Sequence, residues 1–167
     1  MKKIMCAMMF VVISITMNSC SADSAEGTDN STTTEALIAN YSYNDSETET
    51  MKLINDYRLS IGLNALEKIN HISFKCEEHN NYMIANNVVD HNDFTSRSNN
   101  IVSVLGAKKV GENVAYNYKT SEAAVKAWLD SPGHKQNIEG DFTHFGLSVT
   151  TDPKTGKKYY TNIFAKI

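Results

Sequence analysis

Cysteine and long apolar segments are both scarce in this sequence. The chain has 167 residues and three cysteines, at positions 6, 20 and 76. Its sustained apolar run, Ile4–Ile15, is too short for a membrane span, which takes about 20 residues. Lys2 and Lys3 precede this run, and Ser19-Cys20 follows it. The N-terminus is therefore typical of a secretory signal that is not part of the fold.

The end of this signal resembles a bacterial lipobox, with Met17 and Asn18 where Leu and a small residue are usual. We expect residues 1–19 to be removed and Cys20 to be acylated, which would anchor the protein to a membrane; an ordinary cleaved signal peptide is the alternative. Cys6 leaves with the signal, so Cys76 would have no intrachain disulfide partner. An exported domain without disulfides is held together by packing, and Cys76 is expected to be a buried, inert thiol.

Residues 20–46 are rich in Ser, Thr, Asp, Glu, Asn and Ala. Too little of this segment can be buried to offset the entropy of ordering it, so it is predicted to be a flexible polar tether. Its early acidic residues, Asp23 and Glu26, resemble surface-export signals of some Gram-negative lipoproteins. We therefore expect an exported protein, lipid-anchored in the bacterial cell envelope at the outer membrane or cell surface.

Charge of one sign is not concentrated anywhere in the chain. The net charge is −3, and the pairs Lys108-Lys109 and Lys157-Lys158 are interpreted as ordinary solvated residues. A nucleic-acid partner is therefore not expected. Residues 47–167 suffice for one domain with its own core, which we expect to be a monomer.

Hydrophobic periodicity orders the elements of this domain. Helices are expected over 46–61 with Ser46 as N-cap, and over 72–86, 94–105, 121–129 and 132–138, whereas strands are expected over 109–118, 145–149 and 159–164. Helices come first and paired strands last, which predicts helices packed on an antiparallel sheet. Gly111, inside a strand, predicts a bulge or a close backbone approach.

Two histidines and a carboxylate lie in compact motifs rich in Gly and Asn. They are His91 in DHNDFTSR, Glu112 in VGENVAY and His134 in WLDSPGHKQNI. Two imidazoles and one carboxylate can hold a divalent metal such as Zn²⁺ and leave a position for water or a ligand. The three residues come from separate segments, so no i, i+4 motif of a dedicated metal site supports this hypothesis.

Five motifs follow one another in an order that resembles the CAP superfamily, which includes cysteine-rich secretory proteins, venom antigens and plant pathogenesis-related proteins. The motifs are NDYRLSIGLNAL, DHNDFTSR, VGENVAY, AVKAWLDSPGHKQNI and FTHFGLSV, and the resemblance covers about residues 48–167. The bacterial branch is the nearer likeness. The resemblance implies an α+β fold, a three-layer α-β-α sandwich with a central antiparallel sheet. It also implies a surface cleft in which His91, Glu112 and His134 take the positions of the family's histidines and glutamate.

The sequence departs from the family pattern in one respect. Many eukaryotic members have a second cleft glutamate one turn after the tryptophan that corresponds to Trp128. Here Leu129, Asp130 and Ser131 follow, and Pro132 ends the helix. The second acid is therefore missing or is replaced imperfectly by Asp130.

Three functions remain open. The favoured one is binding of a lipid, glycan or protein at the cell surface through His91, Glu112, His134 and Asn137, since some CAP proteins bind sterols or fatty acids. The second is metal-assisted, protease-like hydrolysis, with Glu112 as general base and His91 and His134 as the other catalytic candidates. The third is a structural triad without ligand. No convincing nucleophile is visible, so we expect no enzyme.

Other polar residues are expected to be structural. Arg58 is predicted to pair with an acid or to cap a loop carbonyl, and His79 to be a satisfied core histidine. Trp128 is predicted to lie in the core with one acceptor for its N–H. His71 and His144 are expected at exposed or loop positions.

Overall fold

A computed structural model describes residues 36–167 of the chain. The predictions for the signal segment 1–19, for Cys20 and for residues 21–35 of the tether lie outside the described residues. In the described part, no helix is both long enough and apolar enough to cross a membrane.

The elements alternate between helix and strand at first and end in a hairpin. The helices are α1 (Asp45–Ser60), α2 (Asn70–Asn86), α3 (Phe94–Leu105), α4 (Ser121–Asp130) and α5 (Pro132–Ile138). The strands are β1 (Glu67–Lys68), β2 (Lys109–Tyr116), β3 (His144–Thr151) and β4 (Lys158–Lys166). The sheet has the order β1-β3-β4-β2, with all neighbours antiparallel except β1 and β3. Because β1 has only two residues, hydrophobic periodicity could not reveal it.

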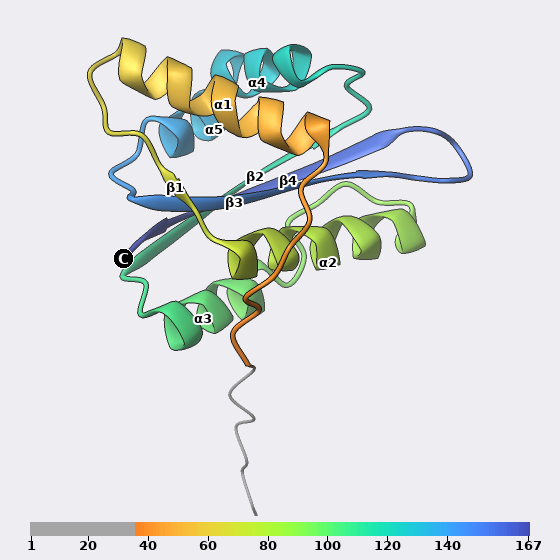
Figure 1. The fold of residues 1–167 in the computed structure, drawn as a ribbon. Helices are drawn as coiled ribbons and strands as arrows, with labels where there is room; N and C mark the ends of the chain where they lie inside the picture. Colours follow the sequence, from red (N-terminus) through yellow and green to blue (C-terminus); the bar gives the residue numbers. More distant parts are fainter. Residues whose placement is uncertain (1–35) are drawn as a thin grey trace, which may run out of the picture. The chain divides into compact units, whose positions relative to one another are not determined.

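The sheet lies between two layers of helices, with α1, α4 and α5 on one face and α2 and α3 on the other (Figure 1). This arrangement confirms the predicted α+β, three-layer sandwich. Side chains alternate between the faces of a strand. On β4, Tyr160 and Phe164 join the cluster beneath α1 and α4, whereas Ile163 packs with Ile72 and Cys76 of α2.

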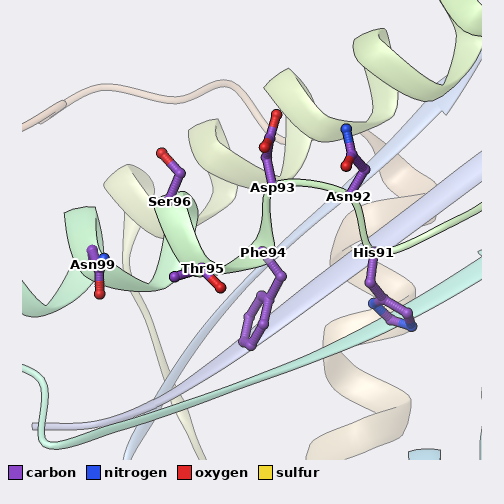
Figure 2. A pocket seen from close by; sticks show the side chains of 7 residues that line it. All are labelled: His91, Asn92, Asp93, Phe94, Thr95, Ser96 and Asn99. Carbon is purple, nitrogen blue, oxygen red and sulfur yellow. The ribbon is translucent and has the colours of Figure 1, made fainter.

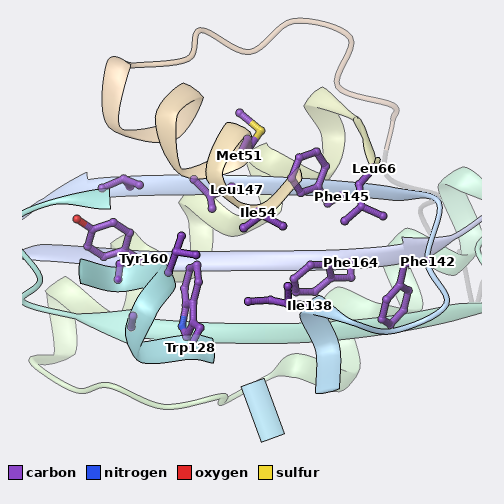
Figure 3. Packing of buried hydrophobic residues seen from close by; sticks show 14 residues of the cluster. Met51, Ile54, Leu66, Trp128, Ile138, Phe142, Phe145, Leu147, Tyr160 and Phe164 are labelled. Atoms are coloured by element: carbon purple, nitrogen blue, oxygen red, sulfur yellow. The ribbon is translucent and has the colours of Figure 1, made fainter. Parts of the chain in front are cut away.

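The larger core fills the space between the sheet and α1, α4 and α5 (Figure 3). Ile54 of α1 and Trp128 of α4 pack there with Phe145 and Tyr160 of the sheet, and all four are almost fully buried. The Trp128 indole donates its Nε1–H to the carbonyl oxygen of Val114 at 3.0 Å. Trp128 is therefore a core residue with one acceptor, as predicted.

On the opposite face, α2 lies directly against β3. A Cβ at Gly146 would be only 2.3 Å from the backbone nitrogen of Ser73, so this approach requires glycine. Cys76 lies in the same layer and is fully buried. Burial raises the pKa of its thiol, which confirms the predicted inert cysteine.

The ordered domain begins earlier than composition suggested. Helix α1 is capped by Asn44, in a capping box with Glu47, and not by Ser46. The Tyr41 hydroxyl donates to Glu47 at 2.9 Å, and the Tyr43 hydroxyl donates to Asn70 at 3.1 Å. Residues 36–46, assigned to the tether from their polar composition, therefore pack on the domain through these tyrosines.

Candidate functional site

Glu112 of β2 is the centre of a buried ion-pair cluster. Its side chain is 2% exposed, and both of its carboxylate oxygens are occupied. Arg97 of α3 donates from Nε to Oε2 at 2.8 Å and from Nη2 to Oε1 at 2.9 Å, and His91 Nδ1 lies 2.8 Å from Oε1. We call these three residues the Glu112 cluster. Its two-pronged Arg–carboxylate geometry is the strong form of such a pair.

The pairing sets the protonation states of the cluster. Burial alone would raise the pKa of Glu112, but the hydrogen bonds from His91 and Arg97 outweigh it and hold that pKa below its ordinary value. Glu112 is therefore an anion, and the Nδ1 of His91 carries the donated proton. The same hydrogen bond raises the pKa of His91, against a smaller lowering by burial.

The loop that carries His91 is held by α2. The helix ends at Asn87, which has a positive φ of 52°. His79 lies 2.9 Å from the Asp90 carbonyl oxygen through Nε2, and the Asn92 backbone N–H donates to the Asp90 carboxylate at 3.0 Å. His79 is buried as predicted, and burial lowers its pKa, so the ring is neutral and donates to Asp90. The prediction that the ring is fully satisfied is wrong, because its buried Nδ1 has no hydrogen-bond partner.

His134 is hydrogen-bonded to residues outside the Glu112 cluster. Its Nδ1 is 2.9 Å from Ser131 Oγ, and its backbone oxygen accepts from Asn113 Nδ2 at 3.0 Å. Burial lowers the pKa of His134, and the charge of His91 lowers it further. Of the predicted triad, hydrogen bonds thus join His91 to Glu112, whereas His134 pairs with Ser131. Glu112 and its neighbour Asn113 point to opposite faces of β2, so one holds His91 and the other holds the backbone of α5.

Asn137 joins these two parts at the backbone. Its Nδ2 donates to the Glu112 carbonyl at 3.0 Å and to Asn113 Oδ1 at 2.8 Å. A Cβ at Gly111 would lie 2.9 Å from Asn137 Oδ1, which confirms the close approach predicted at this glycine. Asn137 therefore positions α5 against the strand.

A groove runs along β2, which is an edge strand of the sheet. It has a volume of about 320 Å³, and its polar wall is formed by His134 and Ser131. The remaining wall is apolar and aromatic and comes from Val89, Val114, Ala115, Tyr116, Tyr118, Ala127 and Trp128. We call it the β2 groove. Its size falls at the lower end of ligand pockets, and no acidic residue lines it.

Asp130 does not supply the missing second acid to this groove. It is exposed and forms an ion pair with Lys126, one turn earlier on α4. The helix ends immediately afterwards at Pro132, as the sequence indicated.

The residues present do not fit the zinc hypothesis. Across residues 36–167, no group of three or more His, Cys, Asp or Glu is arranged to hold a metal ion. The carboxylate of Glu112 already accepts from Arg97 and His91, and the fixed charge of Arg97 opposes a cation there. His91 is 51% exposed, but it belongs to no such group of three in the described part of the chain, and the carboxylate that it contacts is already occupied.

A second hollow, of about 610 Å³, lies outside His91 along the start of α3. Figure 2 shows that His91 and Phe94 point toward the strands, whereas Asn92, Asp93 and Ser96 point away from them. Side chains that diverge in this way cannot converge on one ligand. This hollow is therefore a weaker candidate than the β2 groove.

Arg97 is the residue that sequence reasoning missed. It lies in the same DHNDFTSR motif as His91, six residues later in the first turn of α3, and its side chain is 10% exposed. The motif indicated a functional site, but its sequence did not show that the Arg97 side chain contacts Glu112. Arg58, in contrast, is buried and donates to the carbonyls of Asn64 and Ile138, as predicted for a loop cap.

The sequence is similar to proteins of one family. Residues 51–164 match the cysteine-rich secretory protein family, CAP. The uncharacterized protein YkwD of Bacillus subtilis is 33% identical over 127 residues, which cover 74% of this chain and 48% of that protein. The uncharacterized membrane protein YlbC of the same organism is 43% identical over 60 residues, or 35% of this chain and 16% of that one. The chain thus spans about half or less of these relatives.

Solved structures share the fold. An extracellular protein containing an SCP domain from Bacillus anthracis has a TM-score of 0.64 at 26% identity, covering 73% of this chain and 40% of that one. An outer surface protein from Borrelia burgdorferi has a TM-score of 0.66 at 18% identity, covering 77% of this chain and 98% of that one. At 18% identity the second likeness shows the fold alone.

Proposed function

Because the chain belongs to the cysteine-rich secretory protein family, we propose that it is a binding module of the cell envelope that takes up the apolar chain of a lipid in the β2 groove. The groove supports this proposal through its chemistry. Its aromatic and aliphatic wall offers contact to an alkyl chain, and the His134–Ser131 pair at one side can fix the orientation of a polar group. Glycan and protein ligands offer less apolar surface to such a wall.

The hydrolase alternative has less support from the geometry. A general base must accept a proton, but the pKa of Glu112 is lowered and both of its oxygens are paired. His134 lies beside Ser131, but in a Ser–His–acid triad a carboxylate binds Nδ1 and orients the ring. Here Ser131 Oγ itself occupies Nδ1, so no carboxylate holds the ring in that way. In this proposal the Glu112 cluster is a structural device, and the ligand contacts are made by the groove.

Attachment to the envelope is part of the proposal. The lipobox-like segment before Cys20 motivates it, and a related solved structure is that of an extracellular protein. A Cys20→Ser variant should move from the membrane fraction to the soluble or secreted fraction. Membrane association that is unchanged in this variant would contradict lipidation at Cys20.

Binding can be followed with the protein's own fluorescence. Trp128 is the chain's one tryptophan and lines the groove, so monolauroylglycerol should change its emission. An Ala127→Phe variant would fill the groove and should abolish the response. Ala123→Phe, one turn earlier on the same helix at an exposed position, is the matched control and should bind normally.

A second groove variant shows whether binding is lost because the groove is blocked or because the protein is misfolded. Val89 lines the groove from the α2 side and is 49% exposed, so Val89→Trp should block the groove and leave the thermal stability almost unchanged. Binding that survives both groove variants, or that is absent in the unaltered protein, would refute the proposed function.

A further inference from the structure

A basic pocket adjoins the β2 groove. It has a volume of about 370 Å³ and is formed by the loop 117–119 and by the turn 155–158 of the β3–β4 hairpin. Three lysines line it: Lys119, Lys157 and Lys158. From the sequence, Lys157-Lys158 was interpreted as an ordinary solvated pair. In the folded domain Lys119 lines the same pocket as this pair. We call this the lysine pocket.

The walls of the lysine pocket are fixed to each other. The Asn117 backbone N–H donates to the Lys158 carbonyl at 2.7 Å, and the Tyr160 hydroxyl donates to the Tyr118 carbonyl at 2.9 Å. Lys158 Nζ also donates to Ser46 Oγ at 2.9 Å. The pocket is therefore shaped before a ligand arrives, which lowers the entropic cost of binding.

The three lysines of the pocket have no acidic side chain within ion-pair distance in the described residues. Among the ion pairs of residues 36–167, none involves Lys119, Lys157 or Lys158. Asp152, the acid of the same hairpin, accepts instead from Thr155 Oγ1 and from the Lys154 backbone N–H. Lys158 Nζ donates to the neutral Ser46 hydroxyl and Lys157 Nζ lies 5.5 Å from the centre of the Tyr116 ring, so neither charge meets a counterion there, and an anion in the hollow would supply one.

Tyr118 connects the two hollows, because it lines both the β2 groove and the lysine pocket. An apolar groove that opens beside a cationic pocket is complementary to an anionic amphiphile. We propose that the lysine pocket is the headgroup subsite of the β2 groove and that the ligand is a monoacyl lipid with a phosphate monoester head. This inference rests on the proposed function for the place of the acyl chain.

A phosphate monoester suits this pocket better than a neutral or singly charged head. It carries a charge of about −1.5 to −2 at neutral pH and three strong acceptor oxygens. Lysine binds phosphate as a mobile point charge, so ammonium groups from two segments can approach different oxygens. A glycerol head would leave the lysines without a counterion.

Two probes that differ only in the phosphate test the inference. Binding of lauroyl lysophosphatidic acid and of monolauroylglycerol would be measured by calorimetry and Trp128 emission, below their critical micelle concentrations, with inorganic phosphate as a third probe. The lysophosphatidic acid should bind about tenfold or more tightly than monolauroylglycerol, which corresponds to about 1.4 kcal/mol. Added salt should weaken only the phosphate-bearing probe.

Lysine substitutions test whether the lysine pocket is responsible for the tighter binding of the phosphate-bearing lipid. Lys119→Gln/Lys157→Gln removes two exposed charges and should reduce the affinity for the lysophosphatidic acid to that for monolauroylglycerol, whose own affinity stays unchanged. Lys154→Gln is the matched control, because Lys154 lies on the same hairpin but does not line the pocket. Thermal melting of each variant should match that of the unaltered protein.

The other outcomes separate this inference from the proposed function. Equal binding of the two lipids would overturn the phosphate subsite and leave the groove intact. Inorganic phosphate that binds as tightly as the lysophosphatidic acid would show a free-anion site unconnected to the groove, which also overturns the inference. Failure of both lipids to bind would refute the proposed function, and the headgroup subsite with it.

Discussion

His91 and His134 lie beside the same edge strand, in contrasting surroundings. His91 faces an anionic, arginine-paired carboxylate, and its pKa is raised. His134 faces a serine hydroxyl and an apolar groove, and its pKa is lowered. One histidine therefore belongs to an electrostatic brace between α3 and β2, whereas the other is a neutral group at a hollow. Two histidines from one set of family motifs thus have different partners and opposite pKa shifts.

The largest expected difference between the two regions is in stability. Glu112→Ala leaves Arg97 in a poorly solvated site without its partner and should lower the free energy of unfolding by about 3 kcal/mol. His134→Ala removes one hydrogen bond of a half-buried ring and should cost less than about 1 kcal/mol. Urea unfolding at neutral pH measures both. Similar losses of unfolding free energy in the two variants would contradict the proposed difference between the Glu112 cluster and His134 in the β2 groove.

The link between the regions can be broken at Asn137. Asn137→Ala leaves the Glu112 carbonyl and Asn113 without a donor, and Gly111→Ala adds a methyl group 2.9 Å from Asn137 Oδ1. Each change should cost about 1–2 kcal/mol. The double variant should cost less than the sum, because the shortened side chain at 137 makes room for the new methyl group. Additive losses would show that the two residues do not interact.

The pH dependence of stability should separate the histidines next. The Glu112 hydrogen bond raises the pKa of His91 above its ordinary 6.5, so its contribution is complete below pH 6.5 and is lost as pH rises through the raised value. The pKa of Glu112 is lowered from 4.5, so its contribution is present above pH 4.5 and is lost as pH falls through the lowered value. His91→Ala should therefore destabilise most between about pH 4.5 and 6.5 and less at pH 8.5.

Histidine ring titration by NMR measures the same difference residue by residue. His134 and His79, whose pKa values are lowered by burial, should titrate below 6.5, and His91 should titrate above it. Two coincident titrations of His91 and His134 at the ordinary value would contradict the assigned surroundings of both rings.

The smallest expected effect is that of zinc. Since Arg97 and His91 occupy the Glu112 carboxylate, Zn²⁺ should shift the melting temperature by no more than about 1 °C, which is a small change for a domain of this size. Calorimetry with chelator-treated protein would show stoichiometric zinc if the hypothesis drawn from the sequence were correct. His91→Ala/His134→Ala is the control for any binding that appears.

The sequence predicted the layers well, because they follow from long periodic segments. One buried face of α2 follows from the helical spacing of Ile72, Cys76 and Met83. One buried face of β3 follows from the alternation of apolar side chains on both sides of Leu147. It failed where few residues decide the structure. Two tyrosines tie residues 36–46 to the domain, and His71, expected in a loop or exposed, is buried on α2 and accepts from the Ile38 backbone N–H at 3.1 Å.

The sequence predicted which residues belong to the site, but not how they are arranged in space. The motifs identified His91, Glu112, His134 and Asn137, and the structure places all four on or beside β2. That Glu112 and Asn113 point to opposite faces follows from strand alternation. That Arg97 reaches Glu112 depends on the packing of α3, which no local pattern encodes. For this reason the sequence indicated a triad, whereas in the structure Arg97 and His91 pair with Glu112 and His134 pairs with Ser131.

The most direct test of this account is a chemical-shift titration of the histidine and tryptophan rings with monolauroylglycerol. The His134 ring and the Trp128 indole should shift together in a saturable manner, whereas the His91 ring should stay in place because it belongs to the Glu112 cluster. A ligand that shifts His91 and leaves His134 and Trp128 unchanged would contradict the account and return the binding site to the cleft around Glu112.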